Sequence, residues 1–278
     1  MSIEPGTYPA PPGALQPAPG PDPEERRRRF LGPIGAALLF LVAKGKTVLL
    51  LLPKLKLLTT SASMLVSIGA YALIWGWRFA VGFVLLLLVH ELGHVLQLRR
   101  EGIKASAPLF IPFLGAVVGM KALPKDAAAE ARVGLAGPVL GTLGCLVPVG
   151  LWVATGNDLF QALAFTGFFL NLFNLLPVPP LDGGRAVAAL STWVWLVGFA
   201  GLVALAFVYP NPVLIVILLI GGFETYRRFK QRKTPEAREY HRVEPHTRAA
   251  IAAVYLGLAV LLVAGMDATF LERSLSEV

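Results

Sequence analysis

Apolar stretches separated by short polar or proline-rich connections fill most of the chain after residue 58. A membrane-spanning helix needs about 20 mostly apolar residues. The candidate stretches are 59–74, 79–98, 133–155, 159–176, 186–208, 213–222 and 250–264. This pattern predicts an all-α polytopic membrane protein with about six to seven transmembrane helices.

One apolar segment, 102–121, does not read as a helix, because Pro108, Pro112, Gly115 and Gly119 interrupt it. Irregular backbone survives at membrane depth only where protein or a wet cavity satisfies its polar groups. We therefore expect a short re-entrant or β-hairpin segment near the active site. A plain loop is the alternative.

The remaining segments complete the predicted domain organisation. Residues 1–24 are rich in proline and small residues, which predicts a disordered cytoplasmic tail. Lysines and a proline interrupt the apolar part of 25–58, which favours an interfacial, elbow-shaped amphipathic helix. The core is expected at 59–224, a basic cytoplasmic connection at 225–249, and the last transmembrane helix with the C-terminal tail at 250–278.

Composition and charge agree with a membrane protein. Hydrophobic residues make up 55% of the chain and charged residues 15%, and the mean hydropathy is +0.66. The net charge of +8 comes from basic clusters beside apolar segments, so the positive-inside rule explains it better than nucleic-acid binding. We expect no nucleic-acid partner, a multi-pass protein of the cell membrane and a cytoplasmic N-terminus. The single cysteine, Cys145, excludes an intramolecular disulfide.

The most informative motif is His90-Glu91-Leu92-Gly93-His94, inside the stretch 79–98. Residues four apart lie on one face of a helix, so His90 and His94 can bind one metal ion while Glu91 stands beside it as a base. Ionisable side chains inside lipid are costly unless they pair, bind a metal or face water. The motif therefore predicts a zinc-dependent hydrolase with its site in the cytoplasmic half of the membrane. A polar cluster buried between helices is the alternative.

Such a site needs a third protein ligand. Asp182 is the candidate, because it follows the proline-rich bend Pro177-Val178-Pro179-Pro180 and precedes Gly183 and Gly184. Prolines end a helix and glycines allow close approach, which could direct a carboxylate toward another helix. Asp is also a good N-cap, so a purely structural role stays open.

The two motifs together, His90 to His94 and Asn174 to Gly183, resemble the site-2 protease family of intramembrane zinc metalloproteases. The resemblance covers roughly Phe79 to Arg185. It implies one Zn²⁺ per chain with the ligands His90, His94 and Asp182, and Glu91 as catalytic acid/base.

Two details of the resemblance concern asparagines. It assigns substrate binding to Asn174 rather than Asn171, because Asn174 has the family's spacing to Asp182; an interhelical hydrogen bond is the alternative role for Asn174. The family's Ala-Gly-Pro stretch, here Ala136-Gly137-Pro138, is often followed by an asparagine where this chain has Gly141. We expect that difference to affect a packing contact and not the metal site.

The expected function is hydrolysis of a peptide bond within or near a transmembrane helix of a membrane-protein substrate, in the lipid bilayer. A metal-ion transporter and a non-catalytic membrane scaffold are the rival interpretations. A transporter is expected to place metal-binding groups along a path, and this chain has only four histidines.

Overall fold

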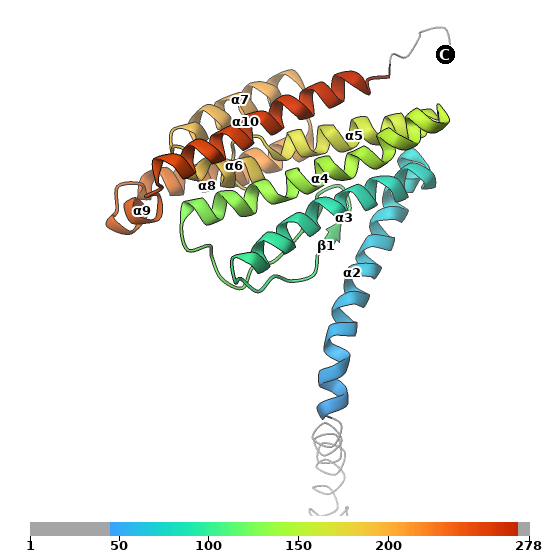
Figure 1. Cartoon of the computed structure of the whole chain (residues 1–278), viewed down its shortest axis with the longest axis horizontal. Helices are drawn as coiled ribbons and strands as arrows, with labels where there is room; N and C mark the ends of the chain where they lie inside the picture. The colour runs from blue at the N-terminus through green and yellow to red at the C-terminus, as the bar shows by residue number, and fades with distance from the viewer. Residues whose placement is uncertain (1–44, 272–278) are drawn as a thin grey trace, which may run out of the picture. The chain divides into compact units, whose positions relative to one another are not determined.

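The computed structural model describes residues 45–271, and helices account for most of them (Figure 1). The chain divides into two compact units, 1–55 and 56–278. Of the first unit only 45–55 is described, and it is helical. The predicted tail at 1–24 and the first part of the predicted segment 25–58 lie outside the described residues.

Ten helical elements follow one another along the described chain. They are α2 (Gly45–Trp75), α3 (Trp77–Arg100), α4 (Ala127–Thr155), α5 (Asp158–Asn174), α6 (Asp182–Ala186), the 3₁₀ helix η1 (Val187–Ala189), α7 (Val194–Val208), α8 (Pro212–Gln231), α9 (Pro235–Tyr240) and α10 (Pro245–Ala268). Helix α2 runs without a break through residue 58, where the sequence predicted a boundary.

Four helical segments among residues 45–271 are long and apolar enough to cross a membrane. They are Leu58–Trp75, Trp77–Arg100, Ala127–Thr155 and Pro245–Ala268. Helices α5 and α7 are apolar but have only 17 and 15 residues. The prediction of a mostly helical membrane protein is confirmed, while the expected number of spans is not.

Helices α3, α4 and α5 form the centre of the second unit. They pack against one another and lie side by side in Figure 1. Their shared core is apolar and includes Val84, Leu87, Leu135, Ala164 and Phe168. One face of α3 is almost entirely covered by this packing, and that face carries the histidine motif.

Side-chain caps fix where several helices begin. Asp126 accepts a hydrogen bond from the Ala129 N–H at the start of α4, and Asn157 accepts one from the Leu159 N–H at the start of α5. Gly156 ends α4 in the left-handed conformation, with φ of 65°. These caps explain the tight turn between α4 and α5, because each satisfies backbone groups that a helix end leaves free.

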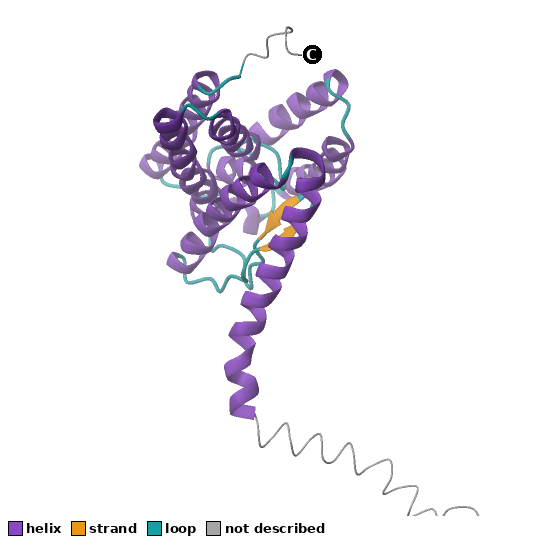
Figure 2. Cartoon of the chain, turned by 90° about the vertical axis from the view of Figure 1, so that its right-hand side faces the viewer, coloured by secondary structure: helices purple, strands orange, loops and turns teal. Residues whose placement is uncertain are grey.

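The irregular segment after α3 contains the predicted β-hairpin. Strands β1 (Leu109–Ile111) and β2 (Gly115–Val117) pair antiparallel, and they are the orange arrows in Figure 2. The hairpin turn needs φ of 95° at Gly115. Strand β2 also packs against α3, so the hairpin lies beside the helix that carries the histidines.

Polar contacts hold the hairpin segment against α2. The Thr60 hydroxyl donates to the Pro108 carbonyl at 2.8 Å, and the Phe113 N–H donates to the Tyr71 hydroxyl at 3.0 Å. The Phe110 N–H donates to the Ser63 hydroxyl at 3.2 Å. The side chains of α2 thus satisfy backbone groups that the two short strands leave open.

A buried ionic cluster joins α4, α8 and α9. Arg228 donates to one oxygen of Glu130 at 2.8 Å, and the Tyr240 hydroxyl donates to the other at 2.8 Å. Burial raises the pKa of Tyr240, so its hydroxyl stays protonated and can donate. The Arg228 guanidinium also lies 5.1 Å from the centre of the Trp195 ring. The cluster fixes the charged connection after α8 beside the start of α4.

Candidate metal centre

Helix α3 presents both histidines of the motif to the interior. His90 and His94 are 2% and 6% exposed, and their Nε2 atoms lie 3.2 Å apart. The helical spacing of four residues causes this closeness, because such residues lie one above the other on a face. Two imidazoles therefore point to one place inside the protein.

Asp182 reaches the same place from a different part of the chain. Its Oδ2 lies 3.0 Å from the Nε2 of His90 and 3.0 Å from the Nε2 of His94. Asp182 is the first residue of α6, and the N-cap is Leu181, so the aspartate is not the cap of that helix. A β-carbon at Gly183 or Gly184 would overlap the backbone of the preceding bend, so only glycine allows this bend to fold so tightly.

In each imidazole, the hydrogen-bond partner of Nδ1 determines whether Nε2 has a free lone pair. The Nδ1 of His94 lies 2.8 Å from the Val133 carbonyl, which can only accept, so this Nδ1 carries a hydrogen. The Nδ1 of His90 lies 2.8 Å from the side-chain oxygen of Asn171 and can donate to it in the same way. In neutral imidazoles both Nε2 lone pairs then converge on the Asp182 carboxylate.

This convergence fits a zinc ion. Three acceptor atoms facing one another in a buried site need a cation or protons between them. A tetrahedral zinc ion with bonds of about 2.0–2.2 Å separates its ligand atoms by about 3.3–3.6 Å, a few tenths of an ångström more than the 3.0–3.2 Å found here. His90, His94 and Asp182 are also the only group of this kind within residues 45–271.

Glu91 lies next to this group on α3 and is 7% exposed. Its carboxylate makes no hydrogen bond or ion pair within the described part of the chain. It does interact electrostatically with His90, with Asp182 and with Arg185 of α6, so it lies close to the same site. A buried carboxylate without a fixed partner is available to exchange a proton.

The structure distinguishes the two asparagines of α5. Asn171 is 2% exposed and its oxygen contacts His90, while its amide donates to the Gly167 carbonyl at 2.8 Å. Asn174, which the sequence assigned to substrate, donates to the Leu170 carbonyl at 3.0 Å and contacts neither histidine. Its role at the substrate stays a prediction. Asn171 is the site residue that sequence reasoning missed, because a one-turn difference along a helix cannot be resolved from spacing alone.

Two glycines of α4 make room for these side chains. A β-carbon at Gly137 would lie 2.2 Å from the Nε2 of His94, and one at Gly141 would lie 2.1 Å from the Asn171 oxygen. Both distances are far below van der Waals contact. Both glycines therefore lie directly against the candidate centre, and Gly141, for which the sequence predicted only a packing contact, leaves the space that Asn171 fills.

We expect Asn171→Leu to weaken zinc binding about 10- to 100-fold, because a ligand histidine loses the group that fixes its ring and tautomer. The matched control is Asn174→Leu on the same helix, which leaves His90 untouched. The measurement is a zinc titration of both purified full-length variants against a competing chelator. Equal affinity in the two variants would show that Asn171 does not orient His90.

A cleft of about 860 Å³ lies beside the candidate centre. It is lined by Val133, whose carbonyl accepts from His94, and by Arg185, three residues after Asp182. The rest of the lining includes the cluster of Glu130, Arg228 and Tyr240. Arg185 has no ion-pair partner within residues 45–271, so its charge is available to the cleft.

Comparisons with known proteins agree with this geometry. The model of peptidase family M50 matches residues 78–157 and 151–205, which include the histidine motif and Asp182. Zinc metalloprotease MJ0392 of Methanocaldococcus jannaschii is 30% identical over 163 residues, which are 56% of this chain and 45% of that protein.

Two further relatives match over shorter regions. Rip3 of Mycobacterium tuberculosis is 33% identical over 135 residues, 44% of this chain and 34% of its own. The Arabidopsis thaliana protein named Probable zinc metalloprotease EGY1, chloroplastic, is 31% identical over 155 residues, 39% of this chain and 28% of its own. The chain thus spans less than half the length of each of these relatives.

Proposed function

We propose that this chain, which belongs to peptidase family M50, the site-2 protease family, is an intramembrane zinc metalloprotease. It hydrolyses a peptide bond within or near a transmembrane helix of a membrane-protein substrate. The observation that carries the proposal is the convergence of His90, His94 and Asp182 to within 3.0–3.2 Å, beside the buried Glu91. We assign the three converging residues as the ligands of one zinc ion.

A bound zinc ion supplies Lewis-acid chemistry, since it polarises a carbonyl and makes a water molecule more acidic. Glu91 accepts a proton from the attacking water as the new carbon–oxygen bond forms at the scissile carbonyl. Glu91 then passes that proton to the amide nitrogen as the carbon–nitrogen bond breaks. Among the described residues it has no fixed hydrogen-bond partner, which leaves the carboxylate free for both transfers.

Water has to reach this site, and the cleft beside it offers a polar route. Arg185 and the charged residues of α8 line the cleft, so water inside it finds hydrogen-bond partners. We assign to Arg185 the binding of substrate or product carbonyl oxygens, since it lines the cleft and forms no salt bridge within residues 45–271. Asn174, half-buried at the end of α5, stays our candidate for contact with substrate backbone.

Charge distribution supports an orientation in the membrane. The end of α3 and the starts of α4 and α10 lie at the same end of the helices in Figure 1. That end carries Arg99, Arg100, Arg132 and Arg248, and under the positive-inside rule this supports a cytoplasmic position. His94 precedes Arg100 by six residues, about 9 Å along a helix. We infer a multi-pass protein of the cell membrane with a cytoplasmic N-terminus and its site in the cytoplasmic half.

The shorter helices also contribute to the proposed number of membrane crossings. Helices α5 and α7 are apolar and have 17 and 15 residues. Together with α8 and the four long helices they support six to seven crossings, some of them shorter than a standard span.

Removing the metal tests the proposed function. We expect the purified full-length protein to cleave a model transmembrane peptide in detergent, to lose at least 100-fold in rate after dialysis against a chelator, and to recover when zinc is added back. Mass spectrometry of the products locates the cut bond. Cleavage that persists in metal-free protein, or zinc uptake into vesicles without cleavage, would contradict the proposal.

A further inference from the structure

We propose that a pocket between α3, α4 and α10 binds one anionic phospholipid. The pocket has a volume of about 540 Å³ and is separate from the candidate metal centre, since none of the three converging residues lines it. Phosphatidylglycerol represents the ligand class, with a phosphodiester headgroup of net negative charge and apolar acyl chains.

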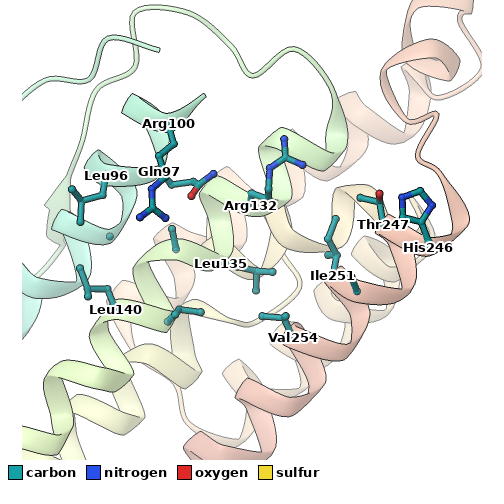
Figure 3. Close-up of a pocket in the computed structure, with 14 residues that line it drawn as sticks. Leu96, Gln97, Arg100, Arg132, Leu135, Leu140, His246, Thr247, Ile251 and Val254 are labelled. Carbon is teal, nitrogen blue, oxygen red and sulfur yellow. The ribbon is translucent and has the colours of Figure 1, made fainter. Parts of the chain in front are cut away.

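The pocket has a polar end and an apolar wall. In Figure 3, Gln97 and Arg100 lie at the end of α3, and Arg132 lies near the start of α4. His246 and Thr247 lie on the first turn of α10. Leu135, Leu140, Ile251 and Val254 lie farther along the same helices. Along the helix axes, polar groups are thus followed by apolar ones. This order matches a headgroup at the membrane surface followed by an acyl chain.

The charge of the polar end favours an anion. No acidic residue lines the pocket. Arg132 is neutralised by Glu101, whose two carboxylate oxygens accept from it at 2.7 and 3.1 Å; the same contact lowers the pKa of Glu101. Arg100 is exposed and forms no ion pair within residues 45–271, so its charge has no protein partner. A guanidinium can donate two parallel hydrogen bonds to a phosphate, which makes it a suitable group for this headgroup.

The pocket is too small for a whole substrate helix, and its volume suits the headgroup and the first part of an acyl chain of a lipid. A transmembrane helix of 20 residues, about 30 Å long and about 10 Å wide, occupies on the order of 2,000 Å³. The pocket holds about a quarter of that volume. It falls within the roughly 300–1,000 Å³ of sites that hold small ligands. The apolar wall is also open to the bilayer, because Leu96, Val139 and Val254 are 48%, 37% and 48% exposed.

Binding of labelled phosphatidylglycerol to the full-length protein in neutral detergent tests this site. We expect Arg100→Gln to raise the Kd about fivefold, the effect of one basic residue near an anionic headgroup. The matched control is Arg99→Gln, an exposed neighbour on α3 that does not line the pocket, and it should change the Kd by less than twofold. Val254→Trp keeps the charge but narrows the apolar wall, so it should weaken binding several-fold.

Competitors complete the test. Phosphatidylcholine should displace the label at least fivefold less well than phosphatidylglycerol, and glycerophosphoglycerol, which has no acyl chains, should not displace it. Equal losses in Arg100→Gln and Arg99→Gln would show diffuse attraction to a basic surface instead of a site. Unchanged binding in Val254→Trp would exclude the apolar wall from the site, and either result would overturn the proposal.

Discussion

Replacing Glu91 by glutamine is expected to lower the rate of peptide cleavage by about 10²- to 10⁴-fold, the usual contribution of a general acid/base. Glutamine has nearly the same shape, but it cannot accept a proton from water. The three converging residues are untouched, so zinc content should stay at one ion per chain. The measurement pairs a cleavage assay on a model transmembrane peptide with metal analysis of the same sample.

The control for this change is Glu239→Gln, because Glu239 is an exposed glutamate of α9 whose one ion pair within residues 45–271 is with Arg242. It should leave cleavage unchanged. If Glu91→Gln kept the activity of the unaltered protein, Glu91 would not be the base. If it also lost its zinc, its role would be in holding the site together.

Replacing Asp182 by alanine is expected to reduce zinc affinity more than 100-fold and to abolish cleavage. This change removes one of three ligands, whereas loss of a supporting residue alone typically costs 10- to 100-fold. The two Nε2 atoms would remain near each other with no carboxylate between helices α3 and α6. Zinc content after gel filtration, compared with that of the unaltered protein, measures the effect.

Asp158→Ala is the matched control, since Asp158 lies in the exposed first turn of α5. Its zinc content and activity should equal those of the unaltered protein. A full zinc complement in Asp182→Ala would mean that the ion is bound elsewhere, and our assignment of the ligands would then be wrong.

The sequence alone predicted that His90, His94 and Asp182 come together at one site. The spacing of His90 and His94 is a local property of one helix, so it places both rings on one face without any knowledge of the fold. The position of Asp182 was harder to predict, because its approach to the two histidines depends on a bend that prolines and glycines make possible. The structure brings these three residues together as the motifs suggested, and their roles are what the variants test.

The sequence could not show the contacts that depend on packing between distant helices. Asn171 and Asn174 are one turn apart, and only the rotation of α5 against α3 determines which of them meets His90. Gly141 was expected to affect a packing contact only, but the side chain that packs against it is Asn171, which contacts His90.

The number of membrane spans could not be fixed from the sequence for a related reason. Hydropathy identifies apolar segments, but it does not show where the backbone leaves the helix. The stretch predicted at 186–208 is divided by η1 and a turn before α7 begins at Val194. The hairpin, in contrast, was predicted correctly because its prolines and glycines exclude a continuous helix.

Anomalous X-ray scattering at the zinc absorption edge tests the central claim most directly. The full-length protein, loaded with zinc in detergent or lipid, should show one strong peak per chain within about 2.0–2.2 Å of the Nε2 atoms of His90 and His94 and an oxygen of Asp182. A peak at any other group of side chains, or none at these three after loading, would contradict the account.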